Sequence, residues 1–305
     1  MKPIEDVFSS DTFRRVVLPG IVLASGIHPL VMKFILVTES LYGLSALAML
    51  VSEVVVFGLV LSSAIQWIFY VYEGFRLSWL TSLAFRANER RVAKLSMAVY
   101  GPRPAASLST AQQNALYESY EHLRDFPIRR DEDGRTERYA ERSTLLGNII
   151  ATYELYPEAT YGVDGVFYWY HILNFAPGSL RTEFAEQIAF MESLVLTSFA
   201  GALVALVHAF VLLGLAIGFW FRRLAVFSLD FGPRLSACLL IFGVAVWILF
   251  YLAALQPSRD ASKIFRTLVD IAMPSFAEWL PSANPSVSSS VAQKAKVFKS
   301  YLRGD

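Results

Sequence analysis

The sequence predicts an all-α membrane protein, a polytopic bundle of four transmembrane helices with a helical cytoplasmic insertion between the second and the third. The first observation is composition: 55% of the 305 residues are hydrophobic and 17% are charged, whereas a soluble domain carries about 25% charge. The second is that the apolar residues are gathered into a few long stretches. The third is the distribution of lysine and arginine, which favours one side of the membrane.

Three of the four predicted spans are long and apolar. A helix needs about 20 apolar residues to cross the hydrocarbon core of a bilayer. Residues 194–220 hold His208 as their only ionisable group, and residues 235–255 hold no acid, base or histidine. Residues 41–72 contain one charge, Glu53, and are long enough to span with tilt or to continue as a helix below the membrane.

The first predicted span, residues 16–37, is interrupted by polar and helix-breaking residues. His28 precedes Pro29, and a residue before proline disfavours the α region, so we expect a kink or a break there. Lys33 adds a charge to the same stretch. We count it as a full span, and a re-entrant hairpin of two half-helices is the alternative.

Lysine and arginine residues near the span ends predict the orientation, because they are enriched in cytoplasmic loops. In a four-span topology, 3 lysine and arginine residues precede the first span, 13 lie in the loop after the second span and 7 follow the fourth span. All of these residues then lie on one side of the membrane. The loop between the third and fourth spans carries 3. This bias places both termini in the cytoplasm and predicts a multi-pass protein of the bacterial inner membrane.

These features divide the chain into four parts. The central part holds 13 basic and 15 acidic residues, so its surface is nearly neutral and nucleic acid is disfavoured as a partner. The composition implies the lipid bilayer as a partner and implies no cofactor. The parts are an N-terminal segment with the first two spans (1–72), a cytoplasmic helical domain (73–190), the last two spans (191–256), and an interfacial amphipathic helix with a flexible basic tail (257–305).

Periodicity and capping residues predict the elements of the cytoplasmic domain. Apolar residues at helical spacing predict helices over 75–98 and 111–124. The charge-dense stretch 129–142 predicts a solvated loop or the start of a helix. Thr144 is placed to cap the next helix. Asp164 is placed to cap a short aromatic helix, and a short buried strand is the alternative there.

The end of the chain changes character again. Residues 258–271 have apolar and charged residues on opposite sides, which is typical of a helix that lies in the inner membrane interface. Pro274, Pro281 and Pro285, together with a serine-rich stretch, predict a flexible tail with a basic end.

Four ionisable side chains inside the predicted spans are functional candidates, namely His28, Lys33, Glu53 and His208. Such groups cost about 2.5–3.5 kcal/mol on insertion scales. A carboxylate and an imidazole at similar depth could pair and relay a proton or coordinate an ion. The alternative is that Glu53 is neutral or hydrogen-bonded to a neighbouring helix. A metal site is disfavoured, because no two ligand types share i, i+3 or i, i+4 spacing within a span.

A second group of candidates is a polar and aromatic cluster in the cytoplasmic domain. It fits a ligand or partner pocket at the base of the spans. The other interpretation is a structural network with an Arg–carboxylate pair and a capped Tyr-Gly-x-Asp turn. We favour this structural network. The cluster comprises Arg142, Asn148, Glu154, Tyr161, Asp164 and Trp169.

Small residues in the third span, Gly201, Gly214 and Gly218, form a stripe that lets helices approach closely. We favour packing within one chain over formation of a homo-oligomer. Signatures of dinucleotide-binding loops, P-loops, nucleophile elbows and zinc peptidases are absent from the sequence. We therefore assign no catalytic or metal-binding residue.

The cytoplasmic domain carries motifs of a known kind. Residues 143–150 read STLLGNII, and Tyr153-Glu154, residues 161–164 (YGVD) and Trp169 follow. This run resembles uncharacterised bacterial multi-pass membrane proteins with the pattern T-x-L-G-N-hydrophobic, an acidic residue, Y-G-hydrophobic-D and a tryptophan. Residues 18–20 (LPG) are similar too. The resemblance implies the topology and implies no activity.

Three functions follow from these observations. The favoured one is a non-enzymatic scaffold, sensor or complex subunit whose helical domain meets a cytoplasmic protein partner. The first alternative is a small oligomeric ion or proton channel or transporter, with Glu53 and His208 lining the path. The second is a lipid-modifying membrane enzyme, for which Asp164 and His171 are the nearest acid–base pair.

Overall fold

The computed structural model describes residues 13–37, 46–74, 78–101, 109–130, 136–220, 233–280, 290–291, 293–296 and 299. Of the described residues, 88% are helical, which confirms the predicted all-α class. Within the described residues, the strands form one two-stranded antiparallel hairpin.

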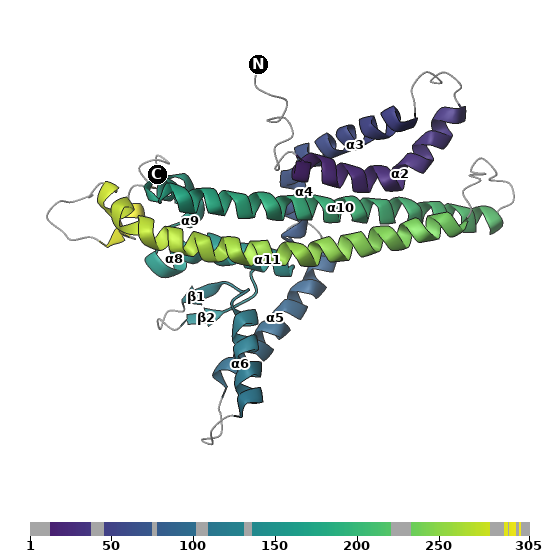
Figure 1. Ribbon diagram of the computed structural model, residues 1–305. Helices are drawn as coiled ribbons and strands as arrows, with labels where there is room; N and C mark the ends of the chain where they lie inside the picture. The colour runs from purple at the N-terminus through teal and green to yellow at the C-terminus, as the bar shows by residue number, and fades with distance from the viewer. Residues whose placement is uncertain are drawn as a thin grey trace, which may run out of the picture. The chain divides into compact units, whose positions relative to one another are not determined.

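Figure 1 shows the elements coloured in chain order, and the chain divides into two compact units. Unit 1 comprises residues 1–69 and 189–254, and unit 2 comprises residues 70–188 and 255–305. The elements are η2 (Phe13–Val17), α2 (Leu18–Val37), α3 (Ala46–Ser63), α4 (Ile65–Tyr72), α5 (Ser78–Tyr100), α6 (Thr110–Leu123), β1 (Ile128–Arg130), β2 (Thr136–Arg138), α7 (Leu145–Glu154), α8 (Tyr156–Tyr161), α9 (Gly165–Phe175), α10 (Gly178–Trp220) and α11 (Pro233–Trp279).

Helices long and apolar enough to cross a bilayer indicate that this is a membrane protein. Among the described residues they are Phe13–Val31, Gly178–Ile217 and Pro233–Trp279. A bent pair, Ala48–Ser63 with Ile65–Tyr72, makes a fourth if the two helices form one span. Three to four candidate spans therefore agree with the predicted membrane bundle.

The kink or break expected at His28-Pro29 does not interrupt the helix, and a bend lies in the second predicted span. α2 continues through Pro29 as one helix, whereas α3 and α4 are bent by 63°. A proline removes one N–H donor and leaves a carbonyl without its usual partner. In α2 that carbonyl belongs to Ser25, four residues before Pro29, and His208 Nε2 lies 3.0 Å from the carbonyl oxygen of the next residue, Gly26.

Glycines let the helices of unit 1 approach at backbone distance. A Cβ at Gly20 would lie 2.1 Å from the carbonyl oxygen of Val54, so α2 and α3 can be this close only with glycine there. Gly201 in α10 likewise faces the backbone of Gly243 in α11. Gly214 faces open space, and the surroundings of Gly218 lie outside the described residues.

The outward faces of unit 1 are apolar. Large apolar side chains on α3, α10 and α11 remain more than half exposed, including Val51, Val60, Phe210, Ile241 and Leu249. A soluble protein rarely exposes contiguous apolar patches of this kind. In a bilayer the same faces contact lipid.

Unit 2 is built on a helical hairpin and a short β-hairpin. Val92 of α5 packs with Leu123, Phe126 and Ala140 in a small core. The charge-dense stretch that we expected to be a loop or a helix start contains β1 and β2, which pair antiparallel. Arg129 lies opposite Glu137 in this pairing, and opposite charges directly across an antiparallel pair stabilise it.

Two predicted helix caps position the elements that follow. The Thr144 hydroxyl accepts a hydrogen bond from the Gly147 N–H at 2.9 Å and begins α7. The Asp164 carboxylate accepts one from the Phe167 N–H at 2.9 Å and begins α9. α9 is therefore the short aromatic helix that the sequence favoured over a buried strand.

The stretch predicted to be an interfacial helix after the fourth span is a continuation of α11. α11 continues through Pro257 and Pro274 to Trp279, and Phe265 and Leu268 are fully buried in unit 2. The Phe265 ring stacks on Trp169 with 4.6 Å between centroids. The apolar side of this stretch thus packs against protein, because α9 supplies aromatic partners that the local sequence does not reveal.

The predicted flexible tail falls mainly on residues outside the described ranges, including Pro281 and Pro285. Among its described residues, Lys299 forms an ion pair with Asp164. The Tyr168 hydroxyl donates a hydrogen bond to the carbonyl oxygen of Ala295 at 2.5 Å. The described end of the chain is therefore packed onto α9.

Candidate anion-binding site

The intramembrane candidates that the structure describes make two separate contacts. His28 Nδ1 lies 2.9 Å from Glu53 Oε2, and His208 Nε2 contacts the carbonyl oxygen of Gly26 instead. Gly26 and His28 are two residues apart, which is about 200° around an α-helix. Glu53 and His208 therefore lie on different faces of α2. The side chain of Lys33 lies outside the described residues.

One atom of each intramembrane partner lacks a hydrogen bond in the described part of the chain. These atoms are Glu53 Oε1 and His208 Nδ1, and both are buried. Each side chain nevertheless ties two helices of unit 1 together through its other polar atom. The contacts that the structure gives them are those of interhelical hydrogen bonds.

Arg142 lies at the centre of a partly buried charge cluster in unit 2. Its guanidinium donates hydrogen bonds to the carboxylates of Glu73 and Glu154, the latter at 2.6 Å. Burial raises the pKa of Glu73 to about 7, against the opposing effect of the Arg142 charge. Burial also raises the pKa of Glu154. The single cation Arg142 thus pairs with two carboxyl groups, and the raised pKa values favour protonation of the Glu73–Glu154 pair.

Asn148 forms a structural network beside this cluster. It is fully buried, and its Oδ1 accepts hydrogen bonds from the backbone N–H groups of Glu141 and Arg142 at 2.8 and 3.0 Å. Its Nδ2 donates to the carbonyl oxygens of Arg142 and Thr144 at 2.6 and 2.7 Å. The oxygen and the nitrogen of the Asn148 amide both hydrogen-bond to the backbone of residues 141–144 and fix its conformation.

The other predicted cluster residues lie apart from Arg142 in their contacts. The Tyr161 hydroxyl donates to Asp270 at 2.8 Å, and burial raises the pKa of Tyr161 to about 12. Asp164 caps α9 and pairs with Lys299. Trp169 packs in the aromatic core, so these three side chains do not form one pocket.

The acid–base pair needed for a lipid-modifying enzyme is also not assembled. Asp164 is held by the Phe167 N–H and by Lys299. The His171 ring lies against Trp279, with 5.1 Å between centroids. No hydrogen bond joins Asp164 to His171 in the described residues.

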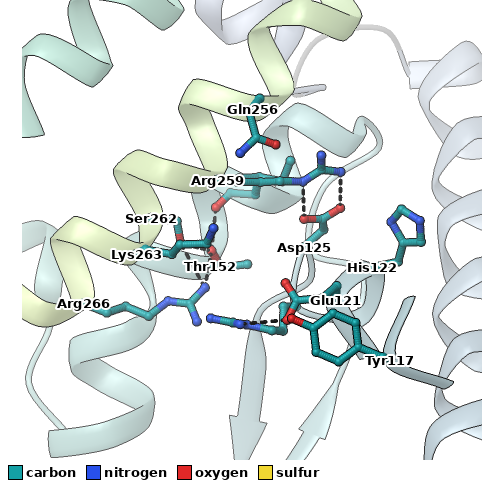
Figure 2. Close-up of a pocket in the computed structure, with 12 residues that line it drawn as sticks. Tyr117, Glu121, His122, Asp125, Thr152, Gln256, Arg259, Ser262, Lys263 and Arg266 are labelled. Atoms are coloured by element: carbon teal, nitrogen blue, oxygen red, sulfur yellow. Dashed lines mark hydrogen bonds and ion pairs between the residues drawn. The ribbon is translucent and has the colours of Figure 1, made fainter. Parts of the chain in front are cut away.

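A polar cavity of about 390 Å³ in unit 2 was not predicted (Figure 2). It lies between the end of α6, one face of α7 and the first turns of α11 beyond Pro257. Its wall contains four cationic side chains and two carboxylates. These are Arg124, Arg259, Lys263 and Arg266 against Glu121 and Asp125.

Ion pairs account for most of these charges. Arg259 donates from Nε and from one terminal nitrogen to the two oxygens of Asp125, each at 2.8 Å, and Figure 2 shows the two groups facing each other. Asp125 is 3% exposed, and such a bidentate pair fixes both side chains. Arg124 pairs with Glu121 at 3.0 Å.

Arg266 is the exception, because its guanidinium has no carboxylate partner in the described part of the chain. It donates to the hydroxyls of Thr152 at 3.1 Å and Ser262 at 2.9 Å (Figure 2). It also lies over the Tyr156 ring at 5.9 Å. Its Nε is buried without a hydrogen bond within the described residues. Among the described residues that line the cavity, Arg266 is therefore a cation without a paired carboxylate.

The spacing of the basic residues explains how α11 lines the cavity. Arg259, Lys263 and Arg266 stand at i, i+4 and i+7, which places them on one face of a helix. This face was visible in the sequence, where we expected it to meet water at a membrane surface. Asp125 gave no comparable local signal, because it belongs to a turn 134 residues away in the sequence.

Comparison of the chain with models of known families, with curated proteins and with solved structures found no match. In the described part of the chain, no three His, Cys, Asp or Glu side chains come together in a way that could hold a metal ion. The site must therefore be interpreted from its own geometry.

Proposed function

We propose that this protein is a membrane-embedded, non-enzymatic sensor that binds a small anionic ligand in the cavity between α6 and α11. The observation that carries the proposal is Arg266, a partly buried guanidinium that lines the cavity and whose hydrogen bonds, within the described residues, go to two hydroxyl groups. A charge removed from water is costly unless it is paired. A bound anion supplies the missing pair.

The neighbouring charges support an anion over a cation as the ligand. Asp125 is already engaged by Arg259 through both oxygens, and Glu121 is engaged by Arg124. Lys263 is exposed at the cavity wall and contacts Asp260 at 3.2 Å. The carboxylates are thus occupied, whereas the cations exceed them in number.

α11 supports a sensing role. The same helix carries Arg259, Lys263 and Arg266 of the cavity and the apolar residues that make it a candidate span. Ligand contacts act directly on this helix. We propose that the cavity faces the cytoplasm of a bacterial inner-membrane protein with both termini inside, which rests on the lysine and arginine distribution.

Transport is the less supported function. It would require Glu53 and His208 to line a common path, and they hydrogen-bond to different faces of α2. A protein partner for unit 2 and a homo-oligomer both remain compatible with a sensor.

The test is anion binding to the full-length protein in neutral detergent micelles. Pyrophosphate and citrate are titrated at constant ionic strength set with KCl, and the thermal midpoint is followed by tryptophan fluorescence. A ligand at 100 times its Kd stabilises the folded state by about 2.7 kcal/mol. We expect at least one of these anions to raise the midpoint, and to be recovered chemically unchanged.

Two variants locate the binding. Arg266→Gln and Lys263→Gln remove cavity charges and should reduce the stabilisation by the anion. Lys94→Gln removes an equal charge from an exposed position on α5 and should leave it unchanged. A midpoint that responds to neither anion beyond the effect of KCl would contradict the proposed function.

A further inference from the structure

A second, smaller cavity adjoins the first in unit 2. It has a volume of about 100 Å³, room for about three waters at about 30 Å³ each. Thr152 and Arg266 line both cavities, so the two cavities share these side chains. Arg138 of β2 also lines the smaller cavity.

Arg138 and Arg266 are two cations directed at this small space, and neither has a carboxylate partner among the described residues. Arg138 donates to the backbone carbonyl oxygens of Phe126 at 2.5 Å and Arg124 at 3.4 Å. Burial lowers the pKa of Arg138. The positive charge of Arg138 also acts unfavourably on Arg266. Two like charges held this way cost free energy, which a dianion between them would offset.

The surroundings increase the strength of such an interaction. Apolar groups of Pro127, Ile128, Leu155 and Ala159 line much of the small cavity, together with Tyr156 and Thr160. Ion pairs and charge-assisted hydrogen bonds are stronger where water is excluded. The size of the cavity fits a group of a few heavy atoms and excludes a larger anion.

We propose that the small cavity is a subsite for the phosphate group of a phosphomonoester, held between Arg138 and Arg266. This rests on the proposed function and names its ligand class. A phosphate monoester carries a charge of about −1.5 to −2 near pH 7 with three acceptor oxygens, and two guanidinium forks match it in charge and geometry. A carboxylate offers one charge and two oxygens.

The remainder of the ligand then occupies the larger cavity. Tyr117 and Ile149 give that cavity an apolar portion, and Gln256 offers a neutral amide. The phosphomonoester can come from a soluble metabolite or from a lipid headgroup of the same chemistry. Both sources present the same group to Arg138 and Arg266.

The experiment compares matched probes on the full-length protein in neutral detergent micelles. Phenyl phosphate, phenyl sulfate and phthalate share an aromatic ring and differ in the anionic group. We expect phenyl phosphate to bind at least tenfold more tightly than either of the others, by competition and by calorimetry. This comparison uses the wild-type protein and so does not depend on the folding of any variant.

Variants then assign the subsite. Arg138→Lys and Arg266→Lys keep the charge and remove the guanidinium fork, and each should weaken phenyl phosphate binding at least tenfold. Arg86→Lys on α5 is the matched control, because Arg86 is exposed and lines neither cavity. Circular dichroism checks that each variant is folded.

The source of the phosphate is tested with the protein in nanodiscs. Preference for phosphatidic acid over phosphatidylglycerol, a phosphodiester, indicates a lipid headgroup, and binding of phenyl phosphate alone indicates a soluble ligand. Phthalate binding as tightly as phenyl phosphate would overturn the subsite and leave the anion sensor standing. Failure of every anion to bind would overturn both.

Discussion

Replacing Glu73 by glutamine should change the pH dependence of stability in a direction that the structure fixes. Burial raises the pKa of Glu73 from 4.5 to about 7. A carboxyl group with a raised pKa in the folded state contributes stability that is fully present below pH 4.5 and is lost as the pH rises through about 7. Glutamine stays neutral and can still accept a hydrogen bond from Arg142, so the variant lacks this loss.

The magnitude follows from the same pKa. At 1.36 kcal/mol per pH unit, the step from 4.5 to about 7 corresponds to about 3.4 kcal/mol. A domain of 150–250 residues changes its thermal midpoint by about 2–4 °C per kcal/mol. The difference in midpoint between Glu73→Gln and wild type should therefore widen by about 7–14 °C between pH 4.5 and pH 8.

The assay is thermal unfolding of both proteins in neutral detergent micelles across this pH range, with far-UV circular dichroism as the signal. Glu118→Gln, an exposed position on α6, is the matched control and should run parallel to wild type. A constant difference between Glu73→Gln and wild type would refute the reasoning. An increase in the stability of wild type relative to the variant as the pH rises would also refute it. In that case the Arg142 ion pair would have a larger effect on the pKa of Glu73 than burial has.

Two further substitutions test the packing. Asp125→Ala leaves Arg259 without its buried carboxylate and should cost about 3–5 kcal/mol of stability. The control is Asp260→Ala, which removes an exposed pair with Lys263 and should cost under about 1 kcal/mol. Equal losses of stability in thermal unfolding would contradict the bidentate pair. Gly20→Ala places a methyl group against the Val54 carbonyl and should cost about 1–3 kcal/mol. Gly214→Ala, with open space around the glycine, should leave stability unchanged or increase it. A stability change of the same sign for Gly20→Ala and Gly214→Ala, measured by unfolding in detergent, would argue against the close approach of α2 and α3.

The helices were predictable where the deciding interaction is local. Thr144 and Asp164 each accept a hydrogen bond from an N–H three residues ahead, so the sequence window that contains the cap also contains its partner. The β-hairpin was missed for the opposite reason. Its charged residues resemble a solvated loop until Arg129 is placed opposite Glu137.

The bend in the second predicted span was not predicted, because the sequence around it carries no helix-breaking signal. Pro29 sits inside α2, whose neighbouring Gly26 carbonyl is contacted by His208. The bend between α3 and α4 follows Ser63, where no proline marks it. Contacts between helices, which a single sequence does not display, decide which potential break is realised.

The candidate site shows the same division between local and distant information. The face formed by Arg259, Lys263 and Arg266 could be read from their spacing, and a basic helix face most simply indicates a membrane surface. The free-energy cost of burying a charge leads to a different interpretation of this basic helix face. A surface arginine needs no partner, whereas Arg266 lies among Thr152, Ser262 and Tyr156 with a buried Nε that has no hydrogen bond in the described part of the chain. Because a protein rarely buries such a charge without a use for it, the missing counter-charge is itself the argument that an anion completes the site.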